Sequence, residues 1–376
     1  MLPGPSNRTE WERIGNGHLR AFVAELVALD WTVTGISASS LLSPSDADNL
    51  ASITHIHWTE SLTLEAPQPL WVKALTMMQA TADRTRPHFV LQHFAQRHLR
   101  TIAARRPLVY QVHDLDSNWL EPARAHLLDR AFKLACLREA HAWVIHERSC
   151  LPLLDTLAAP PKHVAVCPLG DYARFHGEPI PRIEARRRFG WAEDETVFLY
   201  AGYAGPRRNP AATAEAFARL NNAKARLVVA SRNAFRYLRA DLRRVHVRDE
   251  LLENETVRDL YCAADWIVMP GRQYLNSAVV RTALSYGRPV ICIDFGSQSD
   301  MARDAALWLE NESADALYAQ LSRACNMRSE EYETYSREAV ARHVERSWEN
   351  SSRSYVELLD RLRGQAANAP RTSVAP

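Results

Sequence analysis

The sequence of 376 residues lacks several patterns that would assign a protein to a class directly. Its six cysteines include no C-x-x-C pair, which argues against a zinc site and a disulfide framework. No apolar run approaches the ~20 residues of a membrane span, and the first residues lack the apolar stretch of a signal peptide. The net charge of +2 argues against a general nucleic-acid binder. We therefore expect a reduced, cytoplasmic protein.

The glycine fingerprint of dinucleotide-binding proteins, G-x-G-x-x-G, is also absent, which disfavours a nicotinamide dehydrogenase. What the chain has is alternation. Short apolar runs, typical of strands covered on both faces, alternate with helical patterns. The expected strands span 31–37, 53–58, 108–114, 142–147, 164–170, 196–202, 225–231, 244–249, 266–271, 289–294 and 306–311. This pattern predicts an α/β protein with two Rossmann-like, doubly wound parallel-sheet domains and a cleft between them.

A stretch rich in proline and charge, 177–195, separates the two sets of strands. We place the first domain at 1–178 and the second at 179–330. The segment 331–364 is predicted to be a long C-terminal helical segment that packs back on the body, and 365–376 a flexible tail. The helix prediction rests on large apolar residues at helical spacing: Trp348, Tyr355, Leu358, Leu359 and Leu362.

Two segments of the second domain carry groups that can bind phosphate. One strand runs into a loop with Gly205, Arg207 and Arg208, and planar guanidinium groups match phosphate oxygens. A later strand precedes Asn276 and Ser277, which can cap a helix and present N–H groups at its positive end. Because the carboxyl ends of parallel strands share one edge, both segments could face a nucleoside diphosphate. A solvated loop and an ordinary crossover helix are the alternatives.

Polar residues also follow strands of the first domain. His113 and Asp114 come directly after a strand, where an imidazole or a carboxylate could handle a proton or a hydroxyl group. Capping of the next turn is the alternative. Asp114 and Asp116 form a D-x-D pattern, whose position does not favour a metal site. We take Asp116, together with His57 and Glu60 at another strand end, as candidates for acceptor binding. His55 and His57 alternate onto the same face, which would suit a metal pair, but no third ligand is evident, so we expect no metal there.

The segment 84–106 contains six arginines, three histidines and no acidic residue. Phe89, Phe94 and Ile102 are interleaved with the basic residues. A basic amphipathic helix of this kind can lie on an anionic membrane surface or hold an anionic acceptor. A solvated helix face is the ordinary alternative. Peripheral contact with the inner face of the membrane is therefore one expectation for this segment.

Seven segments, taken in order, resemble GT-B glycosyltransferases of the large family-four type, closest to bacterial exopolysaccharide enzymes. They run from His55 to Asp294 and read HIHWTES, VYQVHDLDSNW, AHAWVIHERS, VCPLGDY, IEARRRFGWAEDETVFLYAGYAGPRRNP, ETVRDLYCAADWIVMPG and LNSAVVRTALSYGRPVICID. The resemblance implies transfer of a sugar from a nucleoside diphosphate sugar, without a metal ion or another cofactor. It places the nucleotide, UDP or GDP, on the second domain. The acceptor hydroxyl, of a polysaccharide, a lipid-linked sugar or a small molecule, falls to the first domain.

The resemblance also implies roles for individual residues. Arg208 falls where the family has its diphosphate-binding lysine, and Asn276, Ser277 and Ala278 fall at the phosphate-holding start of a helix. Charge that develops on the leaving nucleoside diphosphate would be stabilised there by Arg208, with Arg207, and by the Ser277 amide.

The sequence departs from the family at positions that contact the donor. Typical members carry two glutamates eight residues apart, and the matching residues here are Tyr274 and Thr282. Gly205 replaces the first basic residue of the usual pair. Arg207 or Arg281 could substitute for the altered donor contacts. These departures leave open a catalytically silent sugar-nucleotide-binding or scaffold protein, and an epimerase of the same fold is a further alternative.

The mechanism depends on the stereochemistry, which the sequence does not decide. If the reaction inverts the sugar, Asp114 is the expected general base and His113 orients the acceptor or the donor sugar. If it retains the configuration, the departing phosphate could itself take the proton, and Asp114 would be a positioning residue.

Overall fold

A computed structural model of the chain describes residues 17–29, 31, 33, 53–57, 72, 89–115, 123–202, 204–205, 208–238, 245–272 and 275–368. The chain divides into two compact units. The first comprises Met1–Pro168 with Trp348–Pro376, and the second comprises Leu169–Ser347. Each unit is built on one parallel sheet, so the predicted α/β class with two Rossmann-like domains is confirmed.

The sheet of the first unit has the order β1-β2-β3-β4, and each neighbouring pair is parallel. The strands are β1 (Thr54–Ile56), β2 (Leu108–Gln111), β3 (Ala142–Ile145) and β4 (His163–Val166). Every residue of β2 and β3 is buried, as expected for strands that are covered on both faces. These four strands coincide with predicted runs, whereas most of the run at 31–37 lies outside the described residues.

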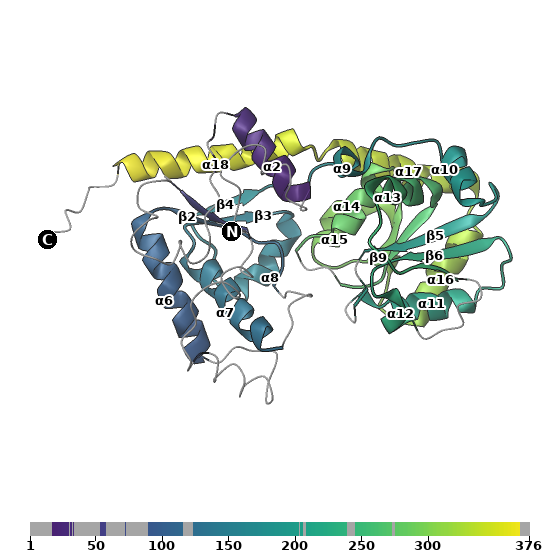
Figure 1. Cartoon of the computed structure of the whole chain (residues 1–376), viewed down its shortest axis with the longest axis horizontal. Helices are drawn as coiled ribbons and strands as arrows, with labels where there is room; N and C mark the ends of the chain where they lie inside the picture. The colour runs from purple at the N-terminus through teal and green to yellow at the C-terminus, as the bar shows by residue number, and fades with distance from the viewer. Residues whose placement is uncertain are drawn as a thin grey trace, which may run out of the picture. The chain divides into compact units, whose positions relative to one another are not determined.

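The helices of the first unit include the C-terminal helix that the sequence predicted. They are α2 (Gly17–Ala28), α6 (Phe89–Arg105), α7 (Ala123–Glu139), α8 (Leu151–Asp155) and α18 (Trp348–Asn368). Figure 1 shows α18 beside α2, and it also packs on β4. Tyr355, Leu358, Leu359 and Leu362 of α18 are buried in one cluster with Val109 and Val144 of the sheet. The helix therefore packs back on the first unit through the apolar face predicted from its spacing, and it continues to Asn368.

The sheet of the second unit has the order β7-β6-β5-β8-β9-β10, with all neighbours parallel. Its strands are β5 (Thr196–Ala201), β6 (Ala225–Ala230), β7 (Val245–Arg248), β8 (Trp266–Met269), β9 (Val290–Ile293) and β10 (Ala306–Leu309). All six coincide with predicted runs. Counted along the chain, this is the doubly wound order 3-2-1-4-5-6, in which ligands bind outside the carboxyl ends of the two central strands. In this unit those strands are β5 and β8.

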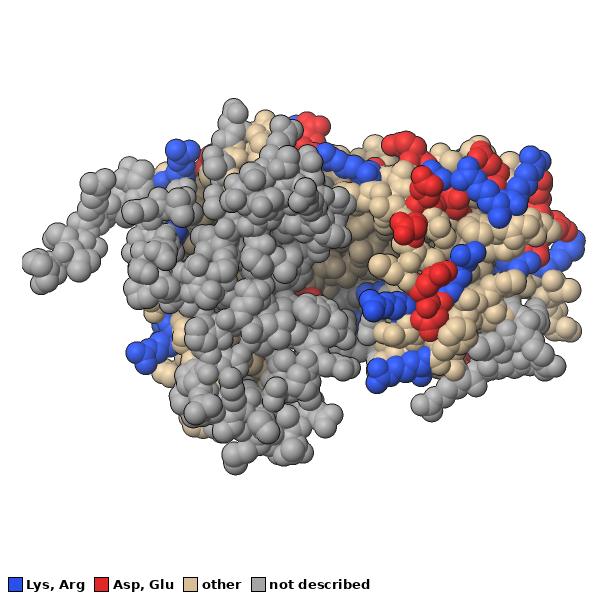
Figure 2. Space-filling model, in the orientation of Figure 1, with Lys and Arg blue, Asp and Glu red and all other residues tan. Residues whose placement is uncertain are grey.

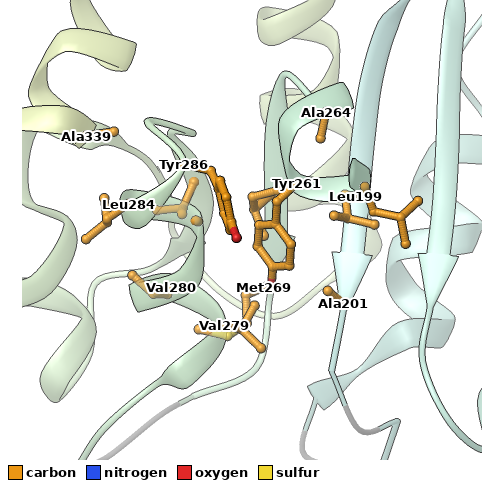
Figure 3. Close-up of a cluster of buried hydrophobic side chains, with 14 of the residues drawn as sticks. Leu199, Ala201, Tyr261, Ala264, Met269, Val279, Val280, Leu284, Tyr286 and Ala339 are labelled. Atoms are coloured by element: carbon orange, nitrogen blue, oxygen red, sulfur yellow. The ribbon is translucent and has the colours of Figure 1, made fainter. Parts of the chain in front are cut away.

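Alternation along the strands divides the core of the second unit between the two faces of the sheet. Val197 and Leu199 of β5 join one apolar cluster, and Phe198 and Tyr200 join the other. Figure 3 shows the first cluster, where Tyr261 lies between Leu199 and Tyr286. Because both faces of β5 are buried, the run appears in the sequence as continuously apolar.

Helices cover both faces of this sheet. They are α9 (Ala173–His176), α10 (Arg182–Phe189), α11 (Pro210–Ala218), α12 (Ala234–Tyr237), α13 (Asn254–Ala263), α14 (Ala278–Ser285), α15 (Ser297–Ala302), α16 (Ala314–Cys325) and α17 (Ser329–Val344). Figure 2 shows basic and acidic side chains interspersed on the described surface, in keeping with the small net charge. Within the part of the chain that the structure describes, none of the helices has the length and apolar character needed to cross a bilayer.

The stretch 177–195, which composition marks as a separator, is an integral part of the second unit. Arg186 of α10 is 1% exposed and donates hydrogen bonds through all three guanidinium nitrogens. Its Nη2 pairs with Asp265 at 2.6 Å, and Nη1 donates to three backbone carbonyls between Ala192 and Glu195. Asp265 also accepts from the backbone N–H of Val197, at the start of β5. This buried ion pair therefore ties α10 to the first strand of the sheet.

Candidate functional site

The two predicted phosphate-binding segments lie close together at the carboxyl ends of β5 and β8. Gly202 directly follows β5 and has φ of +99°, a conformation that favours glycine. A Cβ built on Gly202 would lie 2.9 Å from Nη1 of Arg208 and 2.9 Å from Cγ2 of Val279. These two atoms are therefore separated by at most twice that distance. The predicted convergence of Arg208 and the start of α14 on one edge is what the geometry of the second unit shows.

The local sequence explains how Arg208 is held at this edge. Tyr200 of β5 donates its hydroxyl to the Arg208 carbonyl oxygen at 3.2 Å. The next residue, Asn209, caps α11 by accepting from the N–H of Ala212, and Pro210 begins the helix. The chain is thus fixed on both sides of Arg208, and its guanidinium packs against Gly202.

The Arg208 side chain is partly buried, and this burial lowers its pKa below the ordinary value for arginine. Its electrostatic neighbours are the phenol groups of Tyr200 and Tyr261. Among the described residues, no carboxylate forms an ion pair with Arg208, and no hydrogen bond uses its guanidinium. An unpaired, desolvated cation creates a positive potential that favours an anionic ligand.

Ser277 caps α14 with its side chain. Its hydroxyl oxygen accepts from the N–H of Val280 at 3.2 Å, and the hydroxyl donates to the sulfur of Met269 at 3.2 Å. Thr282 donates its hydroxyl to the carbonyl oxygen of Ala278 at 2.7 Å. Both hydroxyls are therefore used within the protein, so the backbone N–H groups at the start of α14 are the groups that remain suitable for an anion.

A pocket of about 430 Å³ lies beside these groups, entirely within the second unit. Gly202, Ala278, Val279 and Thr282 line it on the side of the strand ends and α14. The other walls are largely apolar and aromatic, with Tyr261 among them. An apolar pocket with a few polar groups at one side is the usual form of a small-molecule site.

Other predicted donor residues have different surroundings. Arg281 is fully buried and donates to the carbonyl oxygen of Gly170 at 2.9 Å and to that of His343 at 3.1 Å, so its side chain holds backbone segments together. Gly205 accepts the N–H of Arg208 at 3.0 Å. Asn276 is partly buried next to the Ser277 cap. Arg207 and Tyr274 lie outside the described residues.

In the first unit, three histidines line the carboxyl edge of the sheet. His57 follows β1, His113 follows β2 and His146 follows β3. Nδ1 of His57 lies 3.3 Å from Nε2 of His113, and Nδ1 of His113 lies 3.1 Å from Nε2 of His146. Nδ1 of His146 lies 2.9 Å from the carbonyl oxygen of Cys167, just after β4. The sequence singled out His57 and His113 but missed His146, which extends the series from His113 to the Cys167 carbonyl.

Asp114 belongs to a cluster of three charged side chains. The Lys133 ammonium contacts the Asp114 carboxylate and lies 3.0 Å from that of Asp129. Lys133 and Asp129 are almost fully buried, whereas the Asp114 side chain is 41% exposed. Lys133 therefore orients Asp114, whose carboxylate reaches the solvent. The remaining acceptor candidates, Glu60 and Asp116, lie outside the described residues.

The predicted basic helix forms as α6, but its apolar stripe is already used. Leu91, Ala95, Leu99 and Ile102 are buried, and α6 packs on α7. The exposed side of α6 carries basic residues, and Phe89 at its start is 72% exposed.

Comparison with known proteins shows which family the second unit resembles. Residues 195–327 match the family model for glycosyl transferases group 1. The match covers 133 of the 376 residues and lies within the second unit. The matched residues include β5, Arg208 and all of α14, which are the elements that build the edge described above.

Two curated relatives are also glycosyltransferases. The chain is 30% identical over 248 residues to a D-inositol 3-phosphate glycosyltransferase of Geodermatophilus obscurus, which covers 59% of this chain and 52% of the relative. It is 29% identical over 161 residues to TuaC of Bacillus subtilis (strain 168), whose name describes a glycosyltransferase of teichuronic acid biosynthesis, with coverage of 42% and 41%. The matches thus span about half the length of these relatives.

Solved structures confirm the fold. Sucrose-phosphate synthase from Thermosynechococcus elongatus has a TM-score of 0.64 at 17% identity, covering 92% of this chain and 93% of that one. Anabaena Alr3699/HepE, solved with UDP-glucose, has a TM-score of 0.57 at 17% identity, covering 79% and 85%. The chain has the GT-B fold, and the resemblance to GT-B glycosyltransferases inferred from the sequence is confirmed.

Proposed function

We propose that the chain transfers a sugar from a nucleoside diphosphate sugar to an acceptor hydroxyl. The bond between the anomeric carbon and the phosphate oxygen breaks, and its electron pair leaves with the nucleoside diphosphate. A new bond forms from the acceptor oxygen to the anomeric carbon, and the acceptor proton passes to a base. The acceptor is a polysaccharide, a lipid-linked sugar or a small molecule.

The observation that carries this proposal is the position of Arg208. Its guanidinium, which has no ion-pair partner among the described residues, packs on Gly202, close to the first turn of α14, at the point where the sheet order reverses. We assign the diphosphate to Arg208 and to the N–H groups at the start of α14, around Ser277 and Ala278. The adjacent pocket of about 430 Å³ then receives the nucleoside. The donor-binding candidates Arg207, Gly205 and Asn276 are neighbours of Arg208 and Ser277 in the sequence.

We assign the acceptor to the carboxyl edge of the first unit. In an inverting reaction, Asp114 takes the acceptor proton and His113 orients a substrate hydroxyl. Lys133 supports this assignment because it fixes the Asp114 carboxylate while leaving it partly exposed. In a retaining reaction, the leaving phosphate takes the proton and Asp114 only positions the acceptor.

The proposed reaction uses no metal ion. Arg208 and the helix N–H groups offer fixed positive charge at the place where negative charge develops on the leaving group. UDP is the first nucleotide to test, because HepE, a structure of the same fold, was solved with UDP-glucose. The name of TuaC supports polysaccharide synthesis as the setting.

A ligand screen followed by a transfer assay tests the proposal. A ligand that binds only the folded protein raises its melting temperature, so the chain is screened against UDP-, GDP- and dTDP-sugars. We expect one donor class to stabilise it and to release nucleoside diphosphate when acceptors from a cell extract are added, with or without EDTA. Binding without release would indicate a silent sugar-nucleotide-binding protein. Conversion of the sugar without release would indicate an epimerase, and no stabilisation by any donor would refute the donor site.

Peripheral membrane contact is a second part of the proposal. Since the apolar stripe of α6 is buried, the contact would be made by its exposed basic side, which includes Arg97 and Arg105. We expect the protein to sediment with vesicles containing anionic lipid and not with neutral vesicles, and the double variant Arg97→Glu with Arg105→Glu to lose this binding. Equal binding of that variant would refute the role of α6.

A further inference from the structure

Among the described residues of the second unit, the buried tyrosines differ in what their hydroxyls contact. Tyr200 donates to the Arg208 carbonyl oxygen at 3.2 Å, and Tyr286 donates to that of Gly177 at 2.8 Å. The third buried tyrosine, Tyr261, is 4% exposed, and no hydrogen bond in the described part of the chain uses its hydroxyl. Buried tyrosine hydroxyls usually have a hydrogen-bond partner. A ligand could supply the partner that the fold does not.

The fold directs the Tyr261 side chain toward the carboxyl edge of the sheet. Tyr261 lies near the C-terminal end of α13, and side chains of a helix lean toward its N-terminus. A short turn joins α13 to β8, so the two elements run in opposite directions and the side chain leans toward the carboxyl end of the strand. Figure 3 shows the ring between Leu199 and Tyr286, and its tip points toward the side on which Val279 and Ala201 lie.

Tyr261 and Arg208 meet at the same pocket. Tyr261 lines it together with Gly202 and Val279, which are the two residues nearest the Arg208 guanidinium in the geometry described above. The Tyr261 phenol is also an electrostatic neighbour of this guanidinium. Thr282 lines the pocket as well, but its hydroxyl hydrogen is used within α14. Of these two hydroxyls, that of Tyr261 can therefore donate to a ligand.

The Tyr261 hydroxyl keeps its hydrogen at neutral pH. The ordinary pKa of tyrosine is about 10, and burial raises the pKa of Tyr261, with the Arg208 charge acting in the opposite direction. A protonated phenol can donate a hydrogen bond, and so can the guanidinium beside it. Ionised phosphate oxygens accept, and hydrogen bonds to an ionised acceptor are stronger than those between neutral groups. Two donors of this kind at one edge suit an anionic ligand.

We propose that the Tyr261 hydroxyl is a second hydrogen-bond donor to the diphosphate, beside the Arg208 guanidinium. This inference rests on the proposed function and adds a neutral donor to the cationic one. Negative charge grows on the diphosphate oxygens as the bond to the sugar breaks, so the hydrogen bond strengthens as the leaving group departs. The phenol binds the diphosphate in this way and transfers no proton.

A pair of phenylalanine variants tests the contact. Tyr261→Phe removes the hydroxyl and keeps the ring, so we expect the affinity for UDP in calorimetry to fall by about 10-fold or more. The melting temperature without ligand should stay unchanged or rise, because the hydroxyl has no partner among the described residues to lose. GDP replaces UDP if the ligand screen selects it. Equal affinities of Tyr261→Phe and the wild type would overturn the proposal.

Tyr286→Phe is the matched control. Its ring centroid lies 6.0 Å from that of Tyr261 in the same apolar cluster. This variant loses the hydrogen bond to the Gly177 carbonyl, so its melting temperature should fall while its affinity for UDP stays within about twofold of the wild type. A loss of affinity in Tyr286→Phe as large as that in Tyr261→Phe would indicate a general effect of the cluster and overturn the contact.

The free nucleoside separates the diphosphate from the rest of the ligand. Uridine keeps the ribose and the base, and its affinity is measured by competition with UDP. Tyr261→Phe should leave the affinity for uridine within about twofold of the wild type, because uridine lacks the group that accepts the hydrogen bond. Equal losses for uridine and UDP would place the hydroxyl at the ribose or the base and overturn the proposal.

Failure of the proposed function gives a different result. Binding of UDP or GDP by the wild type without any transfer would refute the proposed function, and the affinities of Tyr261→Phe would still decide the phenol contact. Transfer by the wild type together with full affinity in Tyr261→Phe would refute the contact alone. Absence of nucleoside diphosphate binding by the wild type would refute both.

Discussion

Removal of the Arg208 guanidinium is the most direct test of the second unit. Because this cation has no acidic partner among the described residues, its substitution leaves no buried carboxylate behind. A charge-assisted hydrogen bond to a phosphate contributes about 1.5–3 kcal/mol, which corresponds to a loss of affinity of about 10- to 150-fold. We therefore expect Arg208→Ala to weaken nucleoside diphosphate binding by this factor, measured by isothermal titration calorimetry.

The matched control for this experiment is Arg337→Ala, which removes an exposed guanidinium from α17 of the same unit. It changes the net charge equally and should leave the affinity within about twofold, since exposed charges are screened. Arg208→Lys should lie between the alanine variant and the wild type, because an ammonium keeps the charge but loses the forked geometry. Equal affinities of Arg208→Ala and the wild type would remove Arg208 from the site and refute the assignment of the diphosphate.

Three further predictions concern stability and geometry. Gly202→Ala should reduce nucleoside diphosphate affinity at least as strongly as Arg208→Ala in calorimetry, because its methyl group would displace the guanidinium and Val279 and its φ would be strained. Arg186→Met should lower the free energy of unfolding by about 1–3 kcal/mol in urea titrations, since it leaves buried carbonyl oxygens without their donor and Asp265 with Arg182 as its remaining ion-pair partner; unchanged stability would contradict this. Burial lowers the pKa of His146 to about 4 and that of His55 to about 3, from 6.5, so both are neutral when folded but protonated when unfolded at mildly acidic pH. The free energy of unfolding should therefore not depend on these two histidines above pH 6.5. As the pH falls from 6.5 to about 4, it should decrease by about 1.4 kcal/mol per pH unit for each histidine, and a flat profile would contradict this.

The strands were predictable because both faces of each sheet are covered, which makes the strand sequences continuously apolar. The convergence of Arg208 and the start of α14 also followed from the sequence, since the parallel order places successive strand ends on one edge. The direction of the Arg281 side chain could not be predicted from the sequence. Helical spacing places it on α14, but only the tertiary structure shows that it faces Gly170 and not the pocket.

The three histidines at the carboxyl edge of the first unit were partly visible in the sequence. The runs ITHIH, VYQVH and AWVIH each place a histidine one or two residues after the strand, so the repeated pattern could have pointed to His146 as well. The hydrogen bond to the Cys167 carbonyl could not be predicted, because it depends on the order β1-β2-β3-β4 and on the backbone after β4. The contacts of His146 therefore required the structure.

Two arginines of the second unit are withdrawn from water, one with partners for its guanidinium and one without a partner among the described residues. Arg186 satisfies its donors with four carbonyl oxygens and Asp265, so it contributes to the fold itself. Arg208 is also withdrawn from water, yet no carboxylate or carbonyl of the described residues pairs with its guanidinium. Desolvating a cation without such partners costs stability. Arg208→Met should therefore leave the melting temperature unchanged or raise it while nucleoside diphosphate binding falls, whereas Arg186→Met should lower the melting temperature. A protein keeps an unpaired cation at the expense of stability when a ligand supplies the missing anion, and that is the physical reason for assigning the diphosphate to Arg208.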